Sequence, residues 1–266
     1  MKIDGSRILI TGASGGIGRH LVMALGDMGA QLMVADRPGE ALSKLRADAI
    51  ARGISAVAQG TDLLQPSAPE ELAEHALRVL GGVDILVNLA GIMSFKLFQD
   101  EDAASIERLW RVNVIAPLIL TRSLLPHMLA RGTGRVVNIG SVFGSIGFAC
   151  FANYSANKFA LRGFSQALRR ELHGTGVGVT YVAPRYTRTP LNAGTVSRMA
   201  EELKMNMDNP ERVARHIVTA IEKDQAEHYV GFPESLFVRI NAILPSLVDG
   251  AMRKQNTRMR EFASTQ

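Results

Sequence analysis

The stretch Thr11-Gly12-Ala13-Ser14-Gly15-Gly16-Ile17-Gly18 lies between a short apolar run and a longer amphipathic one. The run before it, Arg7 to Ile10, has the length and composition of a buried strand, and the residues after it repeat apolar side chains at helical spacing. Glycines permit a tight turn and a close approach of the backbone, and the N-terminus of a helix offers unpaired N–H groups. This strand, turn and helix therefore predict a pyrophosphate site.

An acidic residue, Asp36, ends the next apolar run, Gln31 to Ala35. A carboxylate at this place accepts hydrogen bonds from the ribose hydroxyls of NAD and repels the 2′-phosphate of NADP. The neighbouring Arg37 is an opposite signal, because a guanidinium pairs with a phosphate. We predict NAD as the preferred cofactor and NADP as the alternative. The structural alternative for Asp36 is an N-cap of a helix that starts at Pro38.

Apolar runs of strand length alternate with helix-length segments along the chain. The runs are almost continuously apolar, which is typical of a parallel sheet covered by helices on both faces. This pattern predicts an α/β fold, a Rossmann-type doubly wound parallel sheet of about seven strands, in one domain of residues 1–266. Beyond Tyr186 the pattern becomes mostly helical, with a substrate-covering insert expected at about 185–208 and a helical extension at about 232–266. The predicted strands are Arg7–Ile10, Gln31–Ala35, Ser55–Ala58, Asp84–Val87, Arg135–Ile139, Gly178–Val182 and Glu227–Val230.

The composition is that of an ordinary globular protein, with 266 residues and 47% hydrophobic content. The single cysteine, Cys150, excludes an intramolecular disulfide, and the first residues lack the pattern of a secretory signal, so we expect a cytoplasmic protein. No uninterrupted apolar run reaches the ~18 residues of a membrane span. The formal charge is +5, but the basic residues are spread along the chain, so no nucleic-acid partner is predicted. No metal site is predicted either.

Two residues, Tyr154 and Lys158, have the types and the spacing that suit proton transfer. Residues four apart share a helix face, so the ammonium of Lys158 is expected close to the phenol of Tyr154. A phenol has a pKa near ~10, and a neighbouring cation lowers that pKa by favouring the phenolate. Such pairs also occur by chance on solvated helices, and it is Ser141 and the glycine-rich turn that favour the catalytic interpretation.

At this point the chain resembles the short-chain dehydrogenase/reductases of the single-domain type. The resemblance implies a catalytic tetrad of Asn113, Ser141, Tyr154 and Lys158. It also implies that Asp62, with Leu63, binds the adenine, and that Asn88, Ala90 and Gly91 support the cofactor at the end of the fourth strand. A homotetramer or homodimer built through the long helices around Asn113 and Tyr154 is expected. The motifs that carry the resemblance are Thr11-Gly12-x-x-x-Gly16-Ile17-Gly18, Asp62-Leu63, Asn88-Leu89-Ala90-Gly91, Asn113, Ser141, Tyr154-x-x-x-Lys158, and Pro184 with Thr189.

The residue types suit a reversible exchange of a proton and a hydride. Tyr154 is expected to take the hydroxyl proton of an alcohol, or to donate a proton to a ketone oxygen, while the nicotinamide exchanges the hydride. The hydroxyl of Ser141 can donate to a carbonyl or accept from an alcohol. Lys158 is expected to lower the pKa of Tyr154 and to hold the ribose hydroxyls of the nicotinamide.

A proline inside a predicted helix singles out Asn113. Pro117 lacks the N–H that would bond to the carbonyl of residue 113, so this carbonyl is left free. It can hold a water that relays protons between Lys158 and solvent, which is the role that the resemblance implies. The alternative is that the proline only kinks the helix and Asn113 takes no part in proton transfer. Unchanged turnover and pH profile in Asn113→Leu would remove Asn113 from the relay.

The chain departs from the family pattern after the sixth strand, where it reads Pro184-Arg185-Tyr186-Thr187-Arg188-Thr189. Thr189 keeps its place and is expected to contact the nicotinamide carboxamide, with the backbone of Thr187 and Pro184 beside it. Arg185 replaces a glycine, and three interpretations stay open. In the first, the arginine narrows the substrate mouth; in the second, it contacts an anionic group of the substrate; in the third, it is solvated.

The residues that topology places around the substrate are mostly apolar, which suits a bulky hydrophobic alcohol or ketone better than a sugar. Some of them are alternatively core residues. The predicted pocket residues are Met93, Phe95, Val142, Phe143, Phe148, Phe151, Tyr186 and Leu191.

The segment Pro233 to Val248 carries an apolar stripe that basic residues follow, from Arg253 to Arg260. This combination is typical of a segment that lies on an anionic membrane, so a peripheral membrane contact is one interpretation. Packing over the substrate loop and a subunit interface are the other two.

The leading hypothesis is an NAD(P)-dependent oxidoreductase that interconverts a secondary alcohol and a ketone on a lipid-, steroid- or acyl-like substrate, in lipid metabolism. A 3-oxoacyl thioester reductase is the main alternative within enzymes. A cofactor-binding regulator or scaffold is the non-enzymatic alternative, and the complete set of Ser141, Tyr154 and Lys158 disfavours it.

Overall fold

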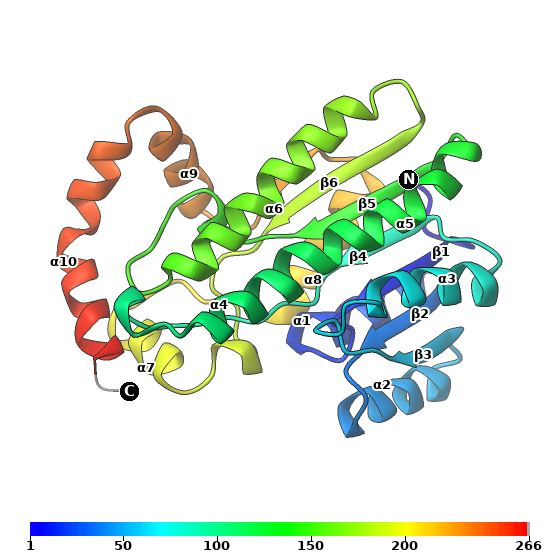
Figure 1. The fold of residues 1–266 in the computed structure, drawn as a ribbon, viewed down its shortest axis with the longest axis horizontal. Helices are drawn as coiled ribbons and strands as arrows, with labels where there is room; N and C mark the ends of the chain where they lie inside the picture. Colours follow the sequence, from blue (N-terminus) through cyan, green and yellow to red (C-terminus); the bar gives the residue numbers. More distant parts are fainter. Residues whose placement is uncertain (265–266) are drawn as a thin grey trace.

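The apolar runs form one seven-stranded sheet in which every pairing is parallel (Figure 1). The structure is a computed structural model and describes residues 1–264. The strands follow each other across the sheet in the order β3-β2-β1-β4-β5-β6-β7, which confirms the predicted α/β fold. Their bounds are β1 Arg7–Thr11, β2 Gln31–Asp36, β3 Ala56–Gly60, β4 Ile85–Asn88, β5 Gly134–Ile139, β6 Val177–Ala183 and β7 Glu227–Tyr229.

Helices cover both faces of the sheet (Figure 1). Successive residues of β1 pack into two different clusters: Ile8 and Ile10 on one face, and Leu9 on the other. Both faces of the central strands are therefore buried, which explains why the strands are almost continuously apolar. One layer contains α1 Gly16–Asp27, α2 Glu40–Ala51 and α8 Pro210–Glu222, and the other contains α3 Ala68–Leu80, α4 Ala103–Trp110, the π-helix η2 Arg111–Ile115, α5 Ala116–Ala130 and α6 Ala152–Glu171.

The helical run from Ala103 to Ala130 is long and apolar enough, by length and composition, to cross a membrane. Half of its most apolar window is buried inside the structure, where it packs against α3 and α6. It thus has the position of a core helix of the domain.

The strand order reverses beside β1, which pairs with β2 on one side and with β4 on the other. In open α/β sheets this reversal leaves a crevice at the carboxyl ends of the strands. The hydroxyl of Thr11, at the end of β1, accepts hydrogen bonds from the N–H groups of Leu89 and Ala90, both at 3.3 Å. The loops after β1 and β4 are thereby joined at the place where a ligand is expected.

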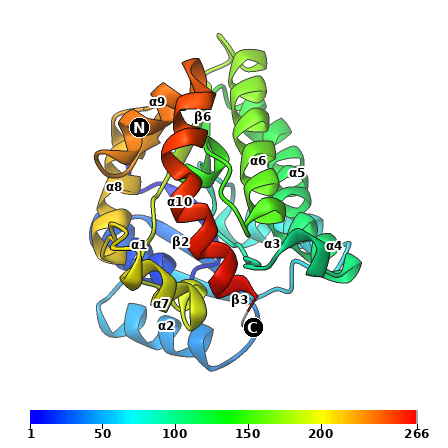
Figure 2. The same cartoon turned by 90° about the vertical axis from the view of Figure 1, so that its left-hand side faces the viewer.

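Two segments that follow β6 pack over this end of the sheet (Figure 2). They comprise the insert, with η4 Pro190–Asn192 and α7 Thr195–Glu202, and the extension, with α9 Glu234–Ile243 and α10 Pro245–Ala263. Met259 of α10 packs in one cluster with Val196 and Met199 of α7, so the extension supports the insert. The last two residues of the predicted extension lie outside the described residues. Two further short helices are η1 Phe98–Asp100 and η3 Val142–Gly144.

Candidate active site

The glycine-rich turn between β1 and α1 is a cradle that side chains would fill. Gly12 has a φ of +68°, and a Cβ atom there would lie 2.6 Å from the Cα atom of Ala90. A Cβ atom at Gly18 would lie 2.3 Å from the carbonyl oxygen of Gly12. No side chain caps the N-terminus of α1. This cradle of backbone N–H groups fits the pyrophosphate of a dinucleotide.

The carboxylate of Asp36 lies against this turn. Its Oδ2 atom accepts hydrogen bonds from the backbone N–H and the hydroxyl of Ser14, at 2.9 and 2.7 Å, and its Oδ1 atom accepts from the N–H of Arg37 at 2.8 Å. The side chain of Arg37 is exposed. Helix α2 begins only at Glu40 and its N-cap is Gly39, so the alternative of Asp36 as a helix cap is wrong.

The other predicted cofactor residues lie along the same edge of the sheet. Asp62 follows β3 and accepts a hydrogen bond from the N–H of Leu64 at 3.1 Å, and Leu63 beside it is buried. Asn88, at the end of β4, donates to Asn138 at 2.8 Å, and its own Oδ1 atom is buried without a hydrogen-bond partner in the described part of the chain. A Cβ atom at Gly16 would lie 2.5 Å from the methyl group of Thr189, so the insert lies directly over the glycine-rich turn.

Three elements bring the four expected catalytic residues together. Ser141 follows β5, Tyr154 and Lys158 lie one turn apart on α6, and Asn113 lies on the π-helix. A Cβ atom on Gly91 would lie 3.4 Å from Oδ1 of Asn113 and 3.7 Å from Nζ of Lys158, so these two side chains meet beside the loop after β4.

The π-helix explains the place of Asn113. Its wider turn is closed by the N–H of Ala116, which bonds to the carbonyl of Arg111 five residues back. The side chain of Asn113 then reaches the backbone of Ile92, where it accepts from the N–H at 2.9 Å and donates to the carbonyl at 2.8 Å. Asn113 thus fixes the loop after β4, and its role in a proton relay stays a prediction.

Burial controls the acidity of Tyr154 and Lys158. Desolvation raises the pKa of Tyr154 to about 12, although a side-chain hydrogen bond to Ser141 lowers it in part. Desolvation also lowers the pKa of Lys158 to about 8. The expectation that Lys158 would lower the pKa of Tyr154 below its usual value is therefore wrong for this structure. Residue spacing showed that the two groups are neighbours but did not show how deeply both are buried.

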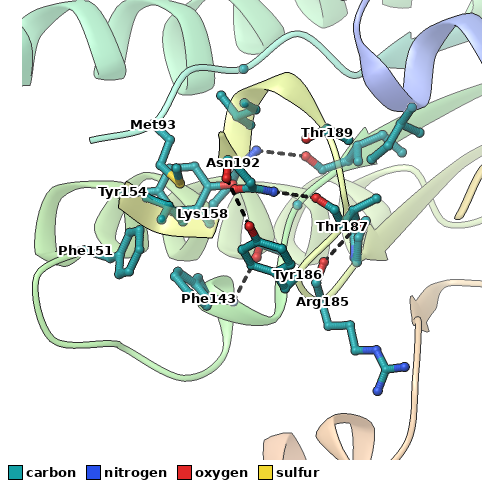
Figure 3. Close-up of a pocket in the computed structure, with 18 of the residues that line it drawn as sticks. Met93, Phe143, Phe151, Tyr154, Lys158, Arg185, Tyr186, Thr187, Thr189 and Asn192 are labelled. Carbon is teal, nitrogen blue, oxygen red and sulfur yellow. Dashed lines mark hydrogen bonds between the residues drawn. The ribbon is translucent and has the colours of Figure 1, made fainter. Parts of the chain in front are cut away.

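A pocket opens in front of Tyr154, with apolar walls from the loop after β4, the loop after η3, and the insert (Figure 3). Five predicted residues line it: Met93, Phe143, Phe151, Tyr186 and Leu191. Ile17, a predicted cofactor residue, and Leu89, from the motif after the fourth strand, line the same pocket. Sequence reasoning missed six further lining residues, to which it assigned no role at the site: Ile139, Gly140, Asn192, Val196, Met199 and Met205.

Three predicted pocket residues have other positions. Val142 is buried against Val238 of α9 and Val248 of α10. Phe95 is buried against Phe151, and Phe148 stacks on Phe143 with ring centres 4.2 Å apart. These side chains support the pocket wall from behind and do not line it.

Arg185 lines the pocket, but its guanidinium points away from it (Figure 3). Its guanidinium donates two hydrogen bonds to Asp208, at 2.9 and 3.0 Å, and one to Glu234 at 2.7 Å. The Asp208 side chain is 1% exposed, and that of Arg185 is 12% exposed. The expectations of an anion contact and of a solvated residue are wrong, because the buried Asp208 and the half-buried Glu234, on two later segments, bind the guanidinium. The narrowing of the substrate mouth stays a prediction, since Arg185 does line the pocket.

Thr187, two residues on, is held by both ends of the insert. It forms an isolated bridge with Asp208, and its carbonyl accepts a hydrogen bond from the side chain of Asn192 at 2.8 Å. Pro184, Thr187 and Thr189 all line the pocket beside Lys158. The predicted contacts of these residues with a nicotinamide are compatible with that position.

A family model described as short chain dehydrogenase matches residues 6–200. The chain belongs to the short-chain dehydrogenase family. The ketoacyl reductase HetN of Nostoc sp. is 33% identical over 258 residues, which cover 94% of this chain and 89% of HetN. The family and its geometry make the protein an NAD(P)-dependent oxidoreductase acting on CH–OH groups and the corresponding ketones.

Solved structures of two relatives share the fold. A short-chain dehydrogenase/reductase from Burkholderia phymatum in complex with NAD has a TM-score of 0.86 and 22% identity, over 93% of this chain and 96% of that one. A protein from Beutenbergia cavernae, described as an NAD(P)-dependent gluconate 5-dehydrogenase with bound NADP, has a TM-score of 0.78 and 29% identity, over 86% and 97% of the two chains. Short-chain dehydrogenases of this fold therefore bind either dinucleotide.

Proposed function

We propose that this short-chain dehydrogenase interconverts a bulky hydrophobic ketone and its secondary alcohol. The observation that carries the proposal is the nearly buried Tyr154, which faces an apolar pocket together with Ser141 and Lys158 and has its pKa raised to about 12. A group with this pKa holds its proton at neutral pH and can donate it to a ketone oxygen.

The residues of the site have different roles in this reaction. Tyr154 donates the proton to the substrate oxygen, and Ser141 donates a hydrogen bond to the same oxygen and orients it. Lys158 holds its position through a 3.0 Å hydrogen bond to the carbonyl of Ile139. When bound in the glycine cradle, the nicotinamide dinucleotide supplies the hydride. The apolar side chains of Met93 and Phe151 exclude water from the reacting carbonyl.

The pocket walls favour an apolar substrate over a polyol. Sulfur and aromatic side chains, such as those of Met199, Met205 and Phe143, face the space in front of Tyr154. A 3-oxoacyl thioester is the second candidate substrate, which similarity to the ketoacyl reductase HetN supports. A cofactor-binding scaffold has no use for the buried Tyr154 and Lys158, whose desolvation is costly.

We propose NAD(H) as the preferred cofactor. The carboxylate of Asp36 lies at the end of β2, where it would meet the adenosine ribose, and it disfavours a phosphate there. Arg37 makes NADP(H) the alternative.

The corner between α9 and α10 supports a peripheral contact with an anionic membrane. Ile243, Leu244 and Leu247 are 77%, 54% and 60% exposed at this corner. Arg239 and Arg253 near it are exposed and form no ion pair within residues 1–264. Apolar side chains flanked by unpaired cations match the chemistry of an anionic bilayer.

The decisive experiment follows the nicotinamide absorbance of NADH or NADPH with a panel of hydrophobic ketones, 3-oxoacyl thioesters and sugar ketones. The proposal expects turnover of apolar ketones and little turnover of the sugars. Turnover of the thioesters alone would favour the second candidate. If the cofactor binds but no substrate of the panel is turned over, the cofactor-binding scaffold is favoured.

A further inference from the structure

A second tyrosine lies directly beneath the active site. Tyr181 belongs to β6 and is 0% exposed. Its hydroxyl accepts a hydrogen bond from the backbone N–H of Ser141 at 3.3 Å and donates one to the backbone carbonyl of the same residue at 3.2 Å. One side chain therefore holds both backbone polar groups of the expected catalytic serine.

The ring of Tyr181 fits against two glycines on either side of Ser141. A Cβ atom at Gly140 would lie 2.1 Å from the Tyr181 hydroxyl oxygen, and one at Gly144 would lie 2.4 Å from it. The Tyr181 backbone is fixed in turn, because its N–H donates to the carbonyl of Ala226 at 3.0 Å. Tyr181 thus occupies the space that side chains at Gly140 and Gly144 would fill.

The neighbours of Ser141 are held by a different means. The N–H of Gly140 bonds to the carbonyl of Val182, and that of Val142 bonds to the carbonyl of Pro184. Ser141 itself has an extended backbone, and its Oγ atom accepts from the N–H of Phe143 at 3.1 Å. Where the β6 backbone gives no partner to Ser141, the hydroxyl of Tyr181 supplies one.

We propose that Tyr181 is a positioning residue, which fixes the backbone of Ser141 so that the serine hydroxyl points at the substrate oxygen beside Tyr154. Displacement of a hydrogen-bonding group by about 1 Å is enough to lower a rate by about a hundredfold. Tyr181 touches neither the pocket nor the reacting atoms, so it acts only through Ser141. The kinetic part of this inference rests on the proposed function.

The kinetic test is a double-mutant cycle. Tyr181→Phe keeps the ring and loses the hydroxyl, and it is expected to lower kcat for the fastest ketone of the panel by about tenfold or more, with an unchanged affinity for NADH. In a Ser141→Ala background the same substitution is expected to have no further effect. An equal loss in both backgrounds would show a general structural role and overturn the proposal, as would no loss in either.

A second measurement needs no substrate and thus separates this inference from the proposed function. Amide hydrogen exchange of Ser141, followed by NMR, is expected to accelerate by about tenfold in Tyr181→Phe, since its N–H loses its partner. Tyr229→Phe is the matched control, because it removes a hydroxyl that bonds to Ser145 instead. Unchanged exchange at Ser141 in Tyr181→Phe, or the same acceleration in the control, would overturn the proposal.

Discussion

The Nζ atom of Lys158 lies 5.6 Å from the centre of the Tyr154 ring, and both side chains are at most 8% exposed. At this separation the cation does not compensate for burial of the phenol, so the tyrosine keeps its proton and the lysine has a depressed pKa. A protonated Tyr154 at neutral pH is the state that the proposed function requires. The free-energy cost of burying these two side chains should be measurable in the free energy of unfolding.

The cost of burying Lys158 predicts a pH-dependent stability. The pKa falls from 10.5 to about 8 on folding, so between these values the unfolded chain binds a proton that the folded chain lacks, and stability rises with pH. This shift corresponds to about 3 kcal/mol. Relative to Lys158→Met, the wild type should gain about that much free energy of unfolding from neutral pH to about pH 10.5. Urea unfolding at several pH values measures it, and parallel curves for the two proteins would refute the depressed pKa.

Removal of the Asp36 carboxylate should change the cofactor preference. In Asp36→Ala the repulsion of a 2′-phosphate is lost and Arg37 stays available, so NADPH should bind more tightly and NADH more weakly. We expect the ratio of the two dissociation constants to change by roughly tenfold to a hundredfold, as for one charge-assisted contact. Fluorescence titration with each nucleotide measures it. A wild-type preference for NADPH would contradict the assignment of Asp36.

Replacement of Arg185 should lower the stability of the fold and leave the substrate preference unchanged. Arg185→Met leaves the buried carboxylate of Asp208 without its bidentate partner, and we expect a loss of about 3 kcal/mol in unfolding free energy. Arg188→Met, at an exposed position three residues later, is the matched control and should be nearly neutral. Denaturant unfolding of both variants tests this. A larger effect of Arg185→Met on the KM of anionic substrates than of neutral ones would restore the rejected anion contact.

The α9–α10 corner should bind anionic vesicles. Wild-type protein is expected to float with vesicles of phosphatidylserine and phosphatidylcholine, and Ile243→Glu/Leu247→Glu should not, because two charges replace the apolar contact. Ile50→Glu changes an exposed apolar residue elsewhere and serves as the control. Equal flotation of wild type and double variant would reject the contact. A change of particle mass in solution, with no flotation, would identify the corner as an interface between copies.

The sheet and its cofactor edge were predictable because they depend on local pattern. Continuous apolar runs predicted every strand to within about two residues at either end, a margin at which assignment methods themselves differ. The turn after β1 was predictable as well, since only glycine fits where a Cβ atom at position 12 would lie 2.6 Å from the backbone of Ala90, in the loop after β4.

The properties that depend on three-dimensional surroundings were not predictable. The sign of the pKa change at Tyr154 follows from its burial, which helix spacing does not give. The partners of Arg185 lie 23 and 49 residues further along the chain. Tyr181 looked like one more apolar strand residue, and its two hydrogen bonds to Ser141 arise from the pairing of β5 with β6. In each case long-range packing decides the role of the side chain.

The most direct test of the account is the rate of ketone reduction by Tyr154→Phe, measured beside the wild type with saturating NADH. The substitution keeps the ring against Phe143 and removes only the hydroxyl, so folding and NADH affinity should be retained. We expect kcat to fall by about a thousandfold, within the range that a general acid contributes. Turnover within a few-fold of the wild type would contradict the claim that Tyr154 donates the proton.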